Sequence, residues 1–120
     1  MPARNYRDLI VWKKAFDLTL AVYEETLCFP REEKYGITAQ LRKACVSIPS
    51  NIAEGEGRKS ASEFRRYLFI ALGLLKEAET QILICESLGY LHQSTAAKLM
   101  EMAAEVGRLL SGLLKSLAHL

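Results

Sequence analysis

The chain has 120 residues and a mass of 13.5 kDa, enough for one domain with a buried core and too short for two. Half of the residues are hydrophobic and a quarter are charged, a composition that excludes a disordered chain. Sixteen lysine and arginine residues oppose fourteen acidic ones, and the net charge of +2 permits a nucleic-acid partner without demanding one.

The cysteines and the N-terminal residues indicate the compartment. Cys28, Cys45 and Cys85 are odd in number, widely separated and set among apolar neighbours, which favours free thiols over a disulfide framework. The first residues lack the apolar core of a signal peptide. The longest apolar run, residues 67–75, is far shorter than the ~20 residues that span a bilayer. We therefore expect a cytoplasmic protein without a membrane partner.

Large apolar residues recur at spacings of three and four along residues 7–28. They are Leu9, Trp12, Phe16, Leu20, Tyr23 and Leu27. This spacing predicts an amphipathic helix of about five turns, with these residues forming its apolar face. The helix is expected to end before Phe29, because a residue that precedes proline is pushed out of the helical region.

A second helix is predicted over residues 32–56, with an uncertain start near Gly36. Its apolar stripe consists of Ile37, Leu41, Ala44, Cys45, Ile48 and Ile52. Pro49 lies inside this helix, where it removes one backbone donor and presses on the Cys45 carbonyl at a cost of roughly 3 kcal/mol. We expect the side chains of Ser47, Ser50 and Asn51 to bond the backbone groups that Pro49 frees.

A third helix, residues 61–88, follows after a tight hairpin that favours antiparallel neighbours. Gly55 and Gly57 supply the preceding C-terminus, and Ser60 and Glu63 fit a capping box. The first half of this helix is apolar almost all the way round, and one bundle core covers only a stripe of it. We expect a second copy of the chain to cover the other face. The predicted interface residues are Phe64, Tyr67, Phe69 and Leu72.

A fourth helix is predicted over residues 94–117, with Gly89 closing the third helix and Ser94 as the N-cap. Its buried stripe consists of Leu99, Met102, Val106, Leu109, Leu113 and Leu117. Four helices joined by short loops predict an all-α, up-down-up-down antiparallel four-helix bundle that forms a single domain over residues 1–120.

Several segments together resemble one protein family. They are residues 6–9, 11–12, 29–30, 35–36, 40, 42, 48–58, 63–64, 67–68, 70–71, 77–81 and 88–91. The string Ile48-Pro49-Ser50-Asn51-Ile52-Ala53-Glu54-Gly55-Glu56-Gly57-Arg58 is the most specific of them. The chain resembles the four-helix-bundle proteins first noticed in intervening sequences of bacterial 23S ribosomal RNA genes. The likeness covers residues 6–91, while the last helix matches in pattern alone.

This resemblance implies a left-handed twist of the bundle and assembly into rings of five. It also implies kinship with the accessory proteins that partner reverse transcriptases of diversity-generating retroelements, which bind nucleic acid. The chain departs from the family pattern at Leu72 and Leu74, where polar residues are usual, so its third helix is more apolar.

Basic residues gather around the hairpin between the second and third helices. They are Arg58, Lys59, Arg65 and Arg66, and Arg42 and Lys43 are candidates to extend the cluster. The positive end of the third helix favours an anion such as phosphate at this place. Alternatively, these cations solvate the turn or pair with Glu54, Glu56 and Glu63, and Arg42 and Lys43 belong to a solvated helix face.

Signals for catalysis, metals and cofactors are weak. The helical Glu-x-x-His elements of a di-metal bundle are missing, because His92 falls in a predicted loop and His119 at the C-terminus. The glycines of the hairpin lack the spacing of a phosphate-cradling loop. We therefore expect no enzyme and no cofactor. The expected function is an oligomeric scaffold that binds RNA or DNA electrostatically. The alternatives are a protein adaptor, such as a partner of a reverse transcriptase, and, least favoured, a metal-dependent enzyme.

Overall fold

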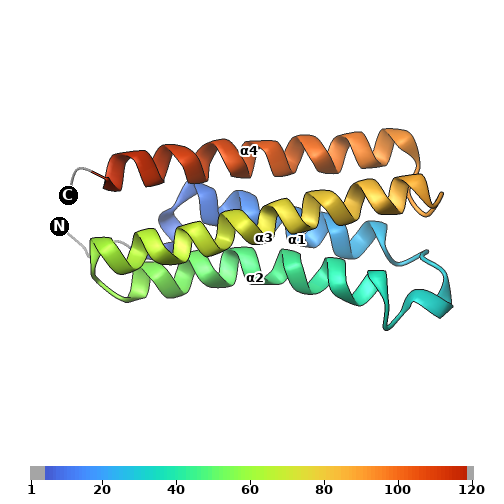
Figure 1. Ribbon diagram of the computed structural model, residues 1–120, viewed down its shortest axis with the longest axis horizontal. Coiled ribbons are helices and arrows are strands. Elements are labelled where there is room, and N and C mark those ends of the chain that lie inside the picture. Colours follow the sequence, from blue (N-terminus) through green and yellow to red (C-terminus); the bar gives the residue numbers. More distant parts are fainter. Residues whose placement is uncertain (1–4, 119–120) are drawn as a thin grey trace.

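The computed structural model describes residues 5–118, which form a bundle of four antiparallel helices. The helices are α1 (Ile10–Glu25), α2 (Ile37–Gly57), α3 (Ala61–Ser87) and α4 (Gln93–Leu117). Each helix contacts the next one along the chain, and α1 also contacts α4, which closes the bundle (Figure 1). This arrangement confirms the predicted fold class. Residues 1–4 and 119–120, and with them His119, lie outside the described residues.

The helix predicted over residues 7–28 is shorter and divided. Asn5 caps a single 3-10 turn, η1 (Tyr6–Asp8), because its Oδ1 accepts a hydrogen bond from Arg7 N at 2.9 Å. Leu9 is extended, so α1 begins only at Ile10. At the other end Thr26 is the C-cap, and its hydroxyl donates to the carbonyl of Val22 at 2.8 Å. The same carbonyl also accepts the backbone N–H of Thr26 at 3.0 Å, so the hydroxyl adds a second bond to the last helical one of α1.

The second predicted helix also starts later than residue 32. A 3-10 turn, η2 (Arg31–Glu33), comes first, and Gly36 then breaks the helical path with φ −103° and ψ −122°. The fourth helix begins one residue early, at Gln93, because His92 Nδ1 rather than the predicted Ser94 hydroxyl caps it, accepting from Ser94 N at 3.1 Å. The backbone conformation of Gly36 and the side-chain cap of His92 therefore set the observed starts of α2 and α4.

The buried face of α1 differs from the predicted apolar stripe. Val11, Ala15, Leu18 and Val22 enter the core, whereas Leu20 is 55% exposed and other large residues of the stripe, including Leu27, also face outward. The helical period was predicted correctly. Leu9 is buried and Trp12 packs partly buried against the core as predicted, but the other four residues of the predicted stripe are exposed. Helix α1 carries two apolar faces, and the small side chains of one of them allow close packing against α2 and α4.

Helix α2 continues through Pro49 without a break. The carbonyl of Cys45, which loses its helical partner to the proline, accepts a hydrogen bond from Thr19 Oγ1 of α1 at 3.0 Å. The prediction that Ser47, Ser50 and Asn51 would fill this role is wrong. Their side chains donate instead to the carbonyls of Lys43, Val46 and Ser47. The proline is thus accommodated by a contact between helices.

The hairpin between α2 and α3 is closely packed. A Cβ built on Gly55 would lie 2.6 Å from Cβ of Tyr67, so only glycine fits this approach of the two helices. Ser60 caps α3 as predicted, since its Oγ accepts from Glu63 N at 3.4 Å. In a capping box the Glu63 carboxylate would also accept a hydrogen bond from the backbone N–H of Ser60. Here it accepts one from Arg66 Nε at 3.2 Å instead.

Candidate functional site

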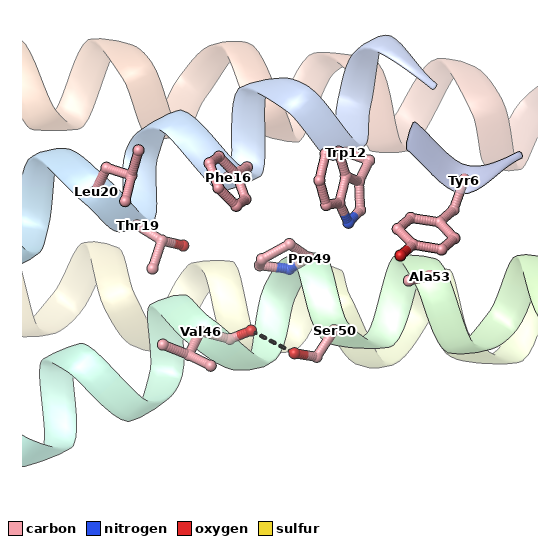
Figure 2. A pocket seen from close by; sticks show the side chains of 9 residues that line it. All are labelled: Tyr6, Trp12, Phe16, Thr19, Leu20, Val46, Pro49, Ser50 and Ala53. Carbon is pink, nitrogen blue, oxygen red and sulfur yellow. Dashed lines mark hydrogen bonds between the residues drawn. The ribbon is translucent and has the colours of Figure 1, made fainter. Parts of the chain in front are cut away.

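A groove of about 370 Å³ runs between the N-terminal part of the chain and α2. Nine residues line it: Tyr6, Trp12, Phe16, Thr19, Leu20, Val46, Pro49, Ser50 and Ala53. None of them is charged. The rings of Trp12 and Phe16 extend from α1 toward Pro49 on α2 (Figure 2). The groove is therefore an open, apolar surface between two helices.

Aromatic contacts hold one wall of this groove. The rings of Trp12 and Phe16 are stacked with centroids 5.1 Å apart, and Tyr6 meets the edge of Trp12 at 5.3 Å. On the opposite wall Pro49 has no N–H to offer, and the hydroxyl of Ser50 already donates to the carbonyl of Val46 at 2.9 Å. The groove suits contact with an apolar surface, and its lining offers no acid or base for catalysis.

Three of the four side chains of the predicted interface on α3 are buried or partly buried within the monomer. Tyr67 is only 7% exposed, and Phe64 and Leu72 pack partly buried against the core. Phe69 alone of the four is well exposed, at 54%. Three large apolar residues of the α1–α2 groove, Phe16, Leu20 and Val46, are well exposed, against one of the four predicted on α3.

The structure brings the basic residues of the hairpin together at one end of the bundle, and Arg58, Lys59 and Arg66 each lie beside an acid or an aromatic ring. Arg58 Nη2 lies 2.7 Å from the Tyr67 hydroxyl and 3.4 Å from Glu54 Oε2. Lys59 pairs with Glu56 at 3.4 Å. Such exposed pairs are weak, worth about 0–1 kcal/mol, so a phosphate would compete with them.

The arginines of α3 complete this cluster. The hydrogen bond from Arg66 to Glu63 raises the pKa of the guanidinium, which also lies over the Tyr67 ring at 4.7 Å from its centroid. Arg65 Nε is buried and has no partner among the described residues. The four predicted phosphate contacts are therefore adjacent, and three of them are partly neutralised by glutamates.

Arg42 does not join the hairpin. It precedes Arg58 by sixteen positions on the same helix, about 24 Å along its axis. Its Nε donates to Thr26 Oγ1 at 2.8 Å, and its guanidinium lies 4.6 Å from the centroid of the Tyr23 ring. Lys43 is exposed one position further along α2. The two candidate extensions of the basic cluster thus lie toward the opposite end of the bundle.

Comparison with known proteins relates this geometry to a family. The model of the 23S rRNA-intervening sequence proteins matches residues 7–112. The chain belongs to this family. The match reaches into α4, beyond the residues 6–91 that carry the resemblance in sequence. No functionally curated protein matches the chain.

A solved structure shows the same fold as this 23S rRNA-intervening sequence family member. It is the crystal structure of a protein of unknown function from the S23 ribosomal protein family of Bacteroides thetaiotaomicron. The two structures superimpose with a TM-score of 0.81 over 88% of this chain and 96% of the other. Their sequences are 20% identical, so the likeness concerns the fold alone.

The buried cysteines and the metal-binding side chains of this family member bear on thiol and metal chemistry. Burial raises the pKa of Cys45 to about 12 and that of Cys85 to about 11, so both thiols stay protonated at neutral pH. Within residues 5–118, no three or more metal-binding side chains come together. No helix in the same range is long and apolar enough to cross a membrane.

Proposed function

We propose that this protein is a non-catalytic assembly scaffold in which the α1–α2 groove binds a second copy of the chain. One observation carries the proposal: α1 has two apolar faces, and the bundle covers only one of them. The uncovered face includes Phe16 and Leu20, which border the groove. Contiguous exposed apolar surface of this kind marks interaction sites in soluble proteins.

The composition of the groove favours a permanent partner with the same chain. Interfaces between identical subunits are more apolar than transient ones, and aromatic residues are enriched in them. The groove combines Tyr6, Trp12 and Phe16 with no charged residue. The family resemblance, which implies rings of five, supports the same partner. In a ring, the groove of each copy would receive the surface of its neighbour.

The interface can be tested with two variants matched in exposure. Leu20→Glu places a charge in the groove, and we expect it to yield folded monomers because a desolvated carboxylate would oppose association. Phe69→Glu places the same charge on α3 at nearly equal exposure, 54% against 55%, and should leave the assembly intact. Sedimentation velocity gives the masses, and circular dichroism reports helicity. An intact Leu20→Glu assembly would contradict the proposal.

Binding of nucleic acid is a second candidate function, favoured by the convergence of Arg58, Lys59, Arg65 and Arg66 on one hairpin. The hairpin lies at the N-terminal end of α3, whose dipole adds positive potential. In a symmetric assembly the cluster repeats in every subunit, and contacts to phosphates would add up. The contacts would be electrostatic, and we expect little base discrimination from them.

A charge-matched pair of variants tests this second function. The first carries glutamate at the four hairpin cations, and the second carries glutamate at Lys13, Lys43, Lys98 and Lys115, so both change the net charge equally. Retention of RNA and DNA is measured across a salt series. We expect the hairpin variant alone to lose binding and the wild type to show a steep salt dependence. Equal losses in both variants would contradict a site at the hairpin.

A further inference from the structure

A second pocket is lined by residues of the connection that leads from α1 through η2 into α2. This connection lies at the end of the bundle opposite the α2–α3 hairpin (Figure 1). Its volume is about 320 Å³, within the range of small-ligand sites. Three cations line it, Arg31, Lys34 and Arg42, and no carboxylate does. This arrangement differs from the hairpin, where glutamates accompany the cations.

Arg42 is held in place by neighbours that do not neutralise it. Its Nε donates to Thr26 Oγ1 at 2.8 Å, and one Nη2 proton points to the carbonyl of Tyr23 at 3.3 Å. The Thr26 hydroxyl in turn donates to the carbonyl of Val22. The guanidinium is thus fixed by neutral groups, and its remaining N–H donors are left for a ligand. A fixed guanidinium loses little side-chain entropy on binding.

Thr38 supplies an independent sign of an absent partner. This residue also lines the pocket and is only 6% exposed, yet its hydroxyl oxygen is buried and has no hydrogen-bond partner. Buried hydroxyls are nearly always paired in native proteins. Thr38 is the second residue of α2, a helix of 21 residues, so the positive end of the helix dipole adds to the three cations.

The acidic residues of the connection are engaged elsewhere or lie outside the pocket. Glu33 accepts a hydrogen bond from the Tyr90 hydroxyl at 2.9 Å and a weaker one from Ile37 N at 3.4 Å. Glu32 is exposed and does not line the pocket. Within residues 5–118, none of the three pocket cations forms an ion pair.

The geometry points to a binding site for a phosphate group, formed by Arg31, Lys34 and Arg42 together with Thr38. A guanidinium fork, a point-charge ammonium and a hydroxyl are complementary to the several oxygens of a tetrahedral dianion. The phosphate belongs either to a free small molecule or to the backbone of a nucleic acid. This site is independent of the α1–α2 groove, so its failure would leave the assembly proposal untouched.

Calorimetric titration of inorganic phosphate into the wild-type protein tests the site directly. We expect saturable binding that weakens at least tenfold in the double variant Arg31→Ala/Lys34→Ala. Within residues 5–118 neither side chain forms an ion pair, and the ring that Lys34 Nζ overlies, that of Tyr35, is 87% exposed. Lys43→Ala removes a neighbouring exposed cation that does not line the pocket, and it should bind phosphate like the wild type. Absence of saturable binding, or equal affinities in all three proteins, would overturn the proposal.

Thr38→Val separates a ligand role from a structural role of the hydroxyl. The substitution removes an unpartnered polar group, so the ligand-free melting temperature should stay equal or rise. Phosphate affinity should fall several-fold. A lower melting temperature with unchanged phosphate affinity would contradict the assignment.

Competition between phosphate and a single-stranded oligonucleotide identifies the source of the phosphate group. Displacement of phosphate by the oligonucleotide assigns the site to nucleic-acid backbone, and absence of displacement assigns it to free phosphate.

Discussion

Gly55→Ala is expected to destabilise the bundle by about 1 to 3 kcal/mol, the usual cost of overpacking a well-packed core. The added Cβ would lie 2.6 Å from Cβ of Tyr67 and 3.2 Å from a ring carbon of Phe64. The Cβ of Tyr67 is attached to its backbone and cannot move away without shifting α3 against α2. Alanine normally stabilises a helix by about 1 kcal/mol relative to glycine. A loss of stability in Gly55→Ala would therefore indicate the close approach of α2 and α3 at this position.

Gly73→Ala is the matched control for Gly55→Ala. Gly73 lies inside α3, and a Cβ added to it would meet nothing within 4 Å. We therefore expect it to stabilise the protein by about 0.5 to 1 kcal/mol. Urea unfolding followed by circular dichroism measures both variants, at one fixed protein concentration because assembly would shift the midpoint. Stabilisation of both variants alike would contradict the packing described around Gly55.

Thr19→Val is expected to cost about 1 to 3 kcal/mol of unfolding free energy, although it nearly preserves the shape of the side chain. Its hydroxyl lies 3.0 Å from the Cys45 carbonyl, which Pro49 leaves without a helical donor. Valine has no hydroxyl to donate, so the partly buried Cys45 carbonyl would have no hydrogen-bond donor. The same hydroxyl is also 2.9 Å from the carbonyl of Ala15, a bond that helix α1 can spare.

A double-mutant cycle with Pro49→Ala identifies the cause of this loss. Alanine restores an N–H at position 49, which can bond Cys45 within the helix. Thr19→Val should then cost about 1 kcal/mol less than it does in the wild type, because its main acceptor has found another donor. The four proteins are compared by urea unfolding. Equal costs in the two backgrounds would show that Thr19 does not serve the proline.

The fold could be predicted because its signals are local and repeated. The 3.6-residue period of apolar residues indicates each of the helices. For α3, Ser60 marks the start and Gly89 the end. Gly89 adopts φ +81°, a conformation that glycine favours. The boundaries of α1 and α2 were less predictable. Thr26 ends α1 with a side-chain hydrogen bond, and the backbone torsions of Gly36 delay the start of α2. The amino-acid composition reveals neither.

The candidate site was harder to predict because it depends on which apolar face is covered. Helix α1 has two stripes, and the larger side chains of Phe16 and Leu20 suggested the wrong one. Only the packing of α2 and α4 decides that the stripe of Ala15 and Leu18 is buried. Likewise, the partner of the Cys45 carbonyl lies 26 residues away, a separation that local reasoning around Pro49 does not reach.

The molar mass of the wild-type protein in solution tests the central claim most directly. Light scattering on protein eluted from a sizing column at micromolar concentration should give a multiple of 13.5 kDa, because the apolar groove on α1 and α2 would be covered by further copies. The mass should persist at high salt, since no charged residue lines the groove. A mass of 13.5 kDa would contradict the account.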